Sequence, residues 1–178
     1  MKHFIQTTTF DPTNISKELD ECRWWNWLNI RRNAYNSQHL YVDDIVLRFQ
    51  PIQEMPTFDD FMNKTECVDF FVQQYLPSTM NLIRYLTKGH EIGRIVVAKL
   101  KAGGVIGNHI DEGDYHKEFS RYHMVISTND KVIFTCEQEK QHMPQGTVWW
   151  FNNRVTHLSI GQTNEQWENN RKIFSEKY

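Results

Sequence analysis

The chain has 178 residues, the size of one ordinary domain, and its formal net charge is −2, from 20 Lys and Arg against 22 Asp and Glu. This near-balance excludes the broad basic surface that tight nucleic-acid binding or attachment to an anionic membrane needs, so we expect neither. The aromatic content (11 Phe, 7 Tyr and 6 Trp) is too high for a disordered chain, and no apolar run approaches the roughly 18 residues of a membrane span. Three cysteines without a CxxC pair, and a start without an apolar signal core, predict a cytoplasmic protein of one domain over residues 1–178.

The first 90 residues carry mainly helical patterns, and we expect them to form a helical region that flanks the rest of the chain. Cap residues and spaced apolar residues predict a helix over residues 14–35. A short strand is predicted at 44–49, before Pro51. Two further helices are predicted, over 57–75 and over 77–89.

From about residue 91 the apolar residues alternate with a period of two. The predicted strands, separated by Gly and Asn-Asp turn signals, are 94–101, 105–109, 121–128, 131–136, 147–151, 155–160 and 171–175. Seven short strands of this kind are typical of a β-sandwich or barrel. We therefore expect a mainly β fold, with a barrel over residues 91–178 and the N-terminal helices packed on its outside.

A candidate metal site begins at the end of one predicted strand, with His109-Ile110-Asp111. Residues i and i+2 of a strand project to the same face, so His109 and Asp111 lie side by side. His157 follows Asp111 by 46 residues, and a jelly roll brings an early and a late strand together. Two histidines and one carboxylate with open coordination positions form the facial triad of non-haem Fe(II) oxygenases. The other interpretation is a core histidine at 157 beside an ordinary His109–Asp111 ion pair.

Basic residues on other predicted strands are candidates for binding an acid beside that metal. Arg171 opens a strand 14 residues after His157, and a guanidinium matches a carboxylate with two parallel hydrogen bonds. Alternation places Arg121 and His123 on one face of their strand. Otherwise Arg171 is a surface residue next to Lys172, and His123 is structural.

The order of these residues resembles the aspartyl/asparaginyl β-hydroxylase-like branch of the Fe(II)/2-oxoglutarate dioxygenases. The resemblance rests on the series Gly103-Gly104, His109-x-Asp111, Arg121-x-His123, Gly146, Trp149-Trp150-Phe151-Asn152-Asn153, His157 and Arg171. It implies a double-stranded β-helix (a jelly-roll or cupin-like barrel) that holds Fe(II) through His109, Asp111 and His157. It also implies that Arg171, helped by Arg121 or His123, binds 2-oxoglutarate. The implied reaction uses O₂, hydroxylates a substrate C–H bond and releases succinate.

The residues that contact the substrate are less constrained by the sequence. Trp25 and Arg48 are candidates because the N-terminal half flanks the pocket mouth in such folds, and Glu112 is a candidate because it follows the metal strand. The histidines outside the series are expected to be solvated or structural, namely His3, His39, His90, His116 and His142.

The resemblance predicts a hydroxylase that acts on a small polar molecule or a peptide side chain. The alternative from another class is a cupin metalloprotein without oxygenase activity, either an isomerase or a small-molecule sensor, which needs no 2-oxoglutarate anchor such as Arg171. A jelly roll without metal, with a structural or interaction role, is the third possibility.

Overall fold

The computed structural model of the protein describes residues 2–33, 37, 39–52, 57–160 and 170–177. In chain order its elements are β1 (Phe4–Thr9), α1 (Thr13–Glu21), α2 (Ile30–Asn33), β2 (Val42–Phe49), α3 (Phe58–Asn63), β3 (Val68–Asp69), the 3₁₀ helix η1 (Phe71–Tyr75), α4 (Pro77–Leu86), β4 (Ile95–Leu100), β5 (Val105–His109), α5 (Asp114–Glu118), β6 (Phe119–Ser127), β7 (Ile133–Cys136), β8 (Glu139–Gln141), β9 (Thr147–Phe151), β10 (His157–Ile160) and β11 (Asn170–Lys177).

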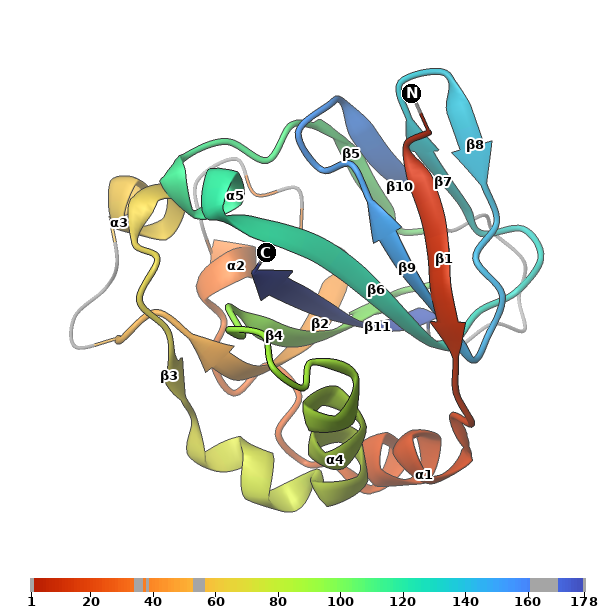
Figure 1. The fold of residues 1–178 in the computed structure, drawn as a ribbon. Helices are drawn as coiled ribbons and strands as arrows, with labels where there is room; N and C mark the ends of the chain where they lie inside the picture. Colours follow the sequence, from red (N-terminus) through yellow and green to blue (C-terminus); the bar gives the residue numbers. More distant parts are fainter. Residues whose placement is uncertain (1, 34–36, 38, 53–56, 161–169, 178) are drawn as a thin grey trace.

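The described strands form two antiparallel sheets (Figure 1). The larger sheet has seven strands in the order β1-β9-β6-β11-β4-β2-β3, and the smaller has four in the order β5-β10-β7-β8. In the smaller sheet β10 pairs with β5 on one side and with β7 on the other. Residues 105–109 and 157–160 therefore lie side by side, although about fifty residues separate them in the chain.

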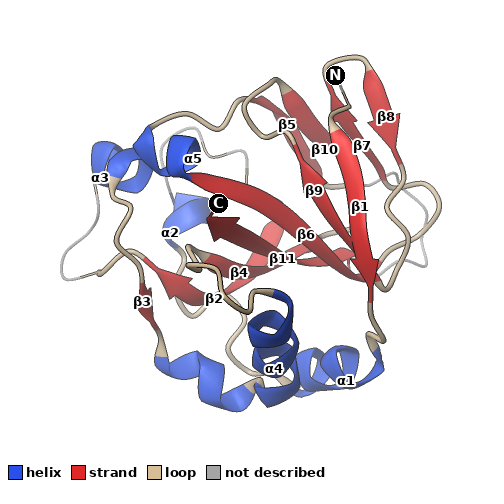
Figure 2. Ribbon diagram, in the orientation of Figure 1, coloured by secondary structure: helices blue, strands red, loops and turns tan. Residues whose placement is uncertain are grey.

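Helices α1 and α4 cover one face of the larger sheet (Figure 2). Side chains of both helices and of β2, β4, β6 and β9 form one apolar cluster there, and Leu19, Ile45 and Ile126 within it are inaccessible to solvent. Helix α1 buries Ile15 and Leu19, which lie one helical turn apart. Burial of each large aliphatic side chain stabilises the fold by roughly 1.5–3 kcal/mol.

The opposite face of the larger sheet packs against the smaller sheet. A second apolar cluster between the two sheets draws on β1, β6, β7 and β9 and includes Phe134 and Phe151. Toward β5 and β10 the side chains leave a pocket between the sheets.

The predicted helix over residues 14–35 ends early, at Glu21, and the chain is irregular until α2. Asn26 adopts a left-handed conformation (φ 58°), and its side chain donates to Asp43 (2.7 Å) and accepts from the amide of Asp44 (3.1 Å). These bonds tie the segment to β2. Helix propensity is a weak preference that such tertiary bonds override, and the helix prediction was wrong over residues 22–29. Residues 30–33 are helical as predicted, and residues 34–35 lie outside the described part of the chain.

The second predicted helix, over residues 57–75, is correct only at its start. Thr57 and Asp60 form the capping box that begins α3, in which each side chain accepts from the other residue's amide (3.1 and 3.0 Å). The helix ends at Asn63, and the chain continues into β3 and η1. The third predicted helix is confirmed as α4.

All seven strands predicted after residue 91 are confirmed, to within two residues at each end. The predictions missed β1, β8 and α5. Strand β1 exposes five of its six residues, so its Gln and Thr residues give no apolar alternation. The N-terminal half is also less helical than expected, because β1, β2 and β3 belong to the larger sheet. No helix in the described part of the chain is long and apolar enough to cross a bilayer.

Candidate metal centre

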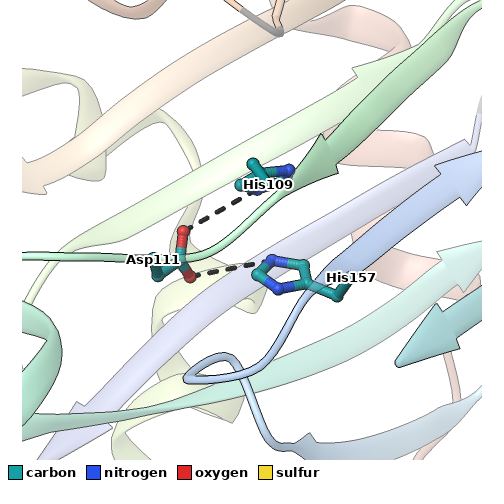
Figure 3. Close-up of side chains that lie close together, drawn as sticks. All are labelled: His109, Asp111 and His157. Carbon is teal, nitrogen blue, oxygen red and sulfur yellow. Dashed lines mark ion pairs between the residues drawn. The ribbon is translucent and has the colours of Figure 1, made fainter. Parts of the chain in front are cut away.

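The side chains of His109, Asp111 and His157 converge, as Figure 3 shows. Both histidines line the pocket. His109 ends β5 and is the direct cross-strand partner of His157, which begins β10. The Asp111 carboxylate lies 3.7 Å from Nε2 of His109 and 3.9 Å from Nε2 of His157. One ligand atom from each residue lies within 4.8 Å of the other two, so a single metal ion can contact all three.

The backbone orients both imidazoles toward this point. Nδ1 of His109 lies 2.8 Å from the carbonyl of Gly107, and Nδ1 of His157 lies 2.9 Å from the carbonyl of Val155. Because a carbonyl only accepts, each Nδ1 carries the proton and each Nε2 presents a lone pair. Nε2 of His157 is buried and has no hydrogen-bond partner among the described residues. A divalent metal would satisfy this buried nitrogen, so the three residues fit a metal ion.

The protonation states of these groups suit metal binding near pH 7. Burial lowers the pKa of His157 to about 4, although the nearby Asp111 carboxylate opposes the change. Burial by itself would raise the pKa of Asp111, but Arg121 and the neighbouring histidines hold that pKa well below its usual range. The imidazole of His157 is therefore neutral and the carboxylate ionised, which are the forms that bind metals.

Several neighbours hold the Asp111 carboxylate in place. Oδ2 accepts from Nη1 of Arg121 (2.8 Å) and from the side-chain amide of Asn153 (3.2 Å). Two residues after Asp111, Gly113 adopts a left-handed φ of 92°, and a Cβ there would clash with the carbonyl oxygen of Met62.

The pocket beside this centre contains about 550 Å³ of empty space, including open solvent at its mouth. Its wall combines apolar side chains with cationic, imidazole and hydroxyl groups. The apolar residues are Val42, Ala98, Leu100, Ile106, Phe134, Phe151 and Leu158, and the polar ones are Arg31, His39, His109, Arg121, His123, His157 and Ser159. This combination of apolar walls and a few convergent polar groups is typical of small-molecule sites.

The structure brings two of the predicted cosubstrate-binding residues into this pocket. Arg121 contacts Asp111, and His123 is buried against Phe134 and Phe151, with ring centroids 5.1 and 4.4 Å away. The backbone of Arg171 lies on β11. The Arg171 side chain lies outside the described part of the structure, so its predicted role stays a prediction.

The three predicted substrate residues do not line the pocket. Arg48 donates to the carbonyl of Ile92 (2.9 Å) and to Asp69 (2.8 Å) at the β2–β3 edge of the larger sheet. Trp25 packs against the helix-side cluster. Glu112 is exposed in the turn after Asp111.

Three residues at or near the centre were missed by the sequence-based predictions. His116, expected to be solvated or structural, is buried with Nδ1 3.9 Å from Asp111, and burial lowers its pKa to about 3. His39, expected in the same group, lines the pocket 6.4 Å from His109 between ring centroids. Asn153 was part of the quoted series without a role. The only sequence signal for Asn153 was its place in the Asn152-Asn153 turn shortly before His157.

Comparison with known proteins identifies a matching family and solved structures with the same fold. A sequence model of the aspartyl/asparaginyl β-hydroxylase family matches residues 26–172. No curated protein matches the chain.

Three solved structures share the fold. One is an oxidoreductase of the 2OG-Fe(II) oxygenase family from Burkholderia pseudomallei, with a TM-score of 0.61 and 10% identity over 98% of this chain and 84% of that one. Another is the viral collagen prolyl hydroxylase of Paramecium bursaria Chlorella virus 1 in its 2OG complex (TM-score 0.51, 10% identity, 99% and 97% covered). The third is a prolyl-4-hydroxylase from Pseudomonas putida (TM-score 0.51, 15% identity, 99% and 93% covered). The expected jelly roll is thereby confirmed.

Proposed function

Because the chain belongs to the aspartyl/asparaginyl β-hydroxylase family, we propose that it inserts one oxygen atom of O₂ into a C–H bond of a small polar substrate or a peptide side chain. The enzyme is a 2-oxoglutarate-dependent dioxygenase, with Fe(II) as its metal and 2-oxoglutarate and O₂ as cosubstrates. The observation that carries the proposal is the grouping of His109, Asp111 and His157 beside a pocket whose walls combine apolar side chains with a few polar groups.

In this proposal the three residues hold the iron on one side and leave the other coordination positions open. Fe(II) held by these residues would supply the oxidative chemistry that couples decarboxylation of 2-oxoglutarate, to succinate and CO₂, to hydroxylation of the substrate. The site is preorganised, because the carbonyls of Gly107 and Val155 fix the orientation of the imidazoles of His109 and His157. Arg121 and Asn153 hold the carboxylate of Asp111, which keeps the ligand geometry constant as other groups bind.

The distal carboxylate of 2-oxoglutarate is assigned to a basic residue on β11. Arg171 is the predicted anchor, and the backbone register supports adding Lys172 as a second candidate. Position 172 pairs with Ala98 of β4, which lines the pocket. Position 171 pairs with Lys99, the next residue of β4, which lies on the opposite face of the sheet. Directly paired residues share a face of the sheet. On the β6 side position 171 pairs with Ser127 and position 172 with Val125, with an irregularity between the two pairs, so both residues stay candidates.

Two variants separate these candidates. Arg171→Lys keeps the positive charge but loses the planar guanidinium that forms two parallel hydrogen bonds with a carboxylate. Lys172→Gln loses the positive charge. We expect the variant at the true anchor to raise the KM for 2-oxoglutarate about tenfold to a hundredfold, with metal affinity unchanged. If neither variant changes that KM, the anchor is not on β11, and Arg121 becomes the next candidate.

The function itself is tested on protein purified without O₂. We expect about one Fe(II) per chain and 2-oxoglutarate-dependent succinate release that a substrate from a library of amino acids and peptides stimulates. The Asp111→Ala variant is the matched control and should release no succinate. Bound metal without succinate release under any condition would favour the cupin metalloprotein, and absence of metal binding would favour the structural jelly roll.

A further inference from the structure

Arg31 is a buried cation in the pocket wall with no part in the proposed metal or cosubstrate sites. It lies on α2, and its side chain is only 11% exposed. Its Nη1 is buried and has no hydrogen-bond partner within the described ranges. The same atom lies 3.6 Å from Oδ2 of Asp44, which is an ion pair without a hydrogen bond. A buried guanidinium nitrogen in this state is costly unless a ligand oxygen completes its bonding.

His39 holds this guanidinium at the pocket. Nη2 of Arg31 lies 3.1 and 3.2 Å from the two ring nitrogens of His39, whose ring in turn lies 6.4 Å from that of His109. Burial, followed by the charge of Arg31, lowers the pKa of His39 well below its usual value. His39 is therefore neutral and accepts a hydrogen bond, and the positive charge stays on Arg31, facing the same space as the metal ligands.

Arg31 is a cation separate from the proposed 2-oxoglutarate anchors. It is carried by α2 and pairs with Asp44 of β2, whereas the candidate anchors are on β6 and β11. It lies within electrostatic range of Arg121, which lines the same pocket. Val42, Leu100 and Ile106 give this pocket an apolar wall.

We propose that Arg31, held by His39, binds a carboxylate of the substrate, so that the enzyme hydroxylates a small carboxylic acid whose aliphatic carbons lie against Val42, Leu100 and Ile106. Because the guanidinium, the apolar side chains and the two histidine ligands line the same pocket, an acid held by Arg31 would present its C–H bonds to the space beside the metal. This inference rests on the proposed function, because it assigns the substrate class of the same site.

The test measures binding in the absence of turnover. Protein loaded with Mn(II) and 2-oxoglutarate, kept free of O₂, is titrated by calorimetry with a panel of aliphatic carboxylic and amino acids. Each acid is paired with its primary amide. We expect at least one acid to bind to the wild-type protein at least about tenfold more tightly than its amide.

Variants then assign this preference to Arg31. Arg31→Lys should weaken binding of the acid about tenfold or more, because lysine cannot form the two parallel hydrogen bonds of a guanidinium. The affinities for Mn(II) and 2-oxoglutarate should stay within about twofold of the wild-type values. The matched control is Arg32→Lys on the same helix. Arg32 bonds to the carbonyl of Val42 (2.6 Å) and to Asp43 and does not line the pocket, so no change in the preference for acid is expected.

A double variant, Arg31→Gln with Asp44→Asn, guards against loss of the fold, because it removes both partners of the buried ion pair. We expect it to bring the ratio of acid to amide affinity close to one, which loss of packing alone would not do.

Three outcomes would overturn the inference: equal binding of acids and amides by the wild-type protein, no binding of any acid, or a selective loss of 2-oxoglutarate affinity in the Arg31 variants. Wild-type protein that binds neither Mn(II) nor 2-oxoglutarate would instead overturn the proposed function, and this inference with it.

Discussion

The two faces of strand β6 are both covered by other parts of the fold but have different surroundings. Tyr122, Met124 and Ile126 belong to the apolar cluster under α1 and α4. Arg121 and His123, which alternate with them, face the smaller sheet and line the pocket. Burial therefore does not distinguish structural from functional residues in this protein. The chemistry of the buried group does, because a polar group inside the fold persists only where specific partners compensate for its loss of water.

The largest expected effect is the loss of turnover when a metal ligand on the polar, pocket side is removed. His157→Ala and Asp111→Ala should each reduce turnover at least about a hundredfold and weaken Fe(II) binding, because the facial triad loses a ligand. Neither variant should unfold the protein, as circular dichroism would check.

His142→Ala is the matched control for that prediction. His142 bonds to the carbonyl of Val132 and lies outside the pocket, so its loss should change neither iron content nor activity. Full iron occupancy in both ligand variants would refute the assignment.

The next effect is the pH dependence of stability in the metal-free protein. Burial lowers the pKa of His157 to about 4 and that of His116 to about 3, against about 6.5 in an unfolded chain. Between pH 6.5 and 4 the unfolded chain therefore binds protons that the folded protein does not, so stability falls as pH falls. The expected slope is about 1.4 kcal/mol per pH unit for each histidine.

Urea unfolding at several pH values measures this slope, and His116→Asn should flatten it by one histidine's share. A stability that does not change between pH 7 and 4.5 would mean that these imidazoles are solvated in the folded protein.

A smaller effect is expected on the apolar side of β6. Ile126→Ala should lower the free energy of unfolding by about 2–4 kcal/mol, because it leaves a cavity in a fully buried cluster. The folded variant should bind Fe(II) and 2-oxoglutarate as the wild type does. If Ile126→Ala lowered metal affinity as much as His157→Ala does, packing on one face of β6 and metal binding on the other would not be independent.

The smallest effect is expected for Arg48→Gln. Arg48 bonds to Asp69 and Ile92 at the sheet edge, and exposed ion pairs of this kind contribute about 0–1 kcal/mol. We expect a loss of stability of that size and unchanged KM values in succinate assays. A raised KM for the substrate would restore Arg48 as a substrate contact, as the sequence had suggested.

The sequence predicted the β half well because its strands are short, alternate regularly and end at turn residues. Strands β5 and β9 coincide with their predictions, and the metal triad follows from the two-residue period at His109 and the late position of His157. The helix predicted over residues 14–35 was too long because Asn26 and its bonds to β2 are tertiary features with no local signal.

The pairing of Arg31 with His39, and of both with the metal centre, was equally hidden. These residues precede His109 by 70 residues or more, and only the folded sheet brings them to the same pocket. A lone histidine or arginine in a sequence carries no information about which distant group it will meet.

Strand β11 lies between β4 and β6 and pairs with both, at the centre of the larger sheet. During translation, β4 and β6 emerge from the ribosome well before β11, and 70 residues separate the end of β4 from the start of β11. At typical elongation rates that delay lasts about 4–14 seconds. During this interval one edge of β4 and, once β6 has been synthesised, one edge of β6 remain open to incorrect pairing. The nascent chain is therefore expected to depend on ribosome-associated chaperones until β11 closes the gap.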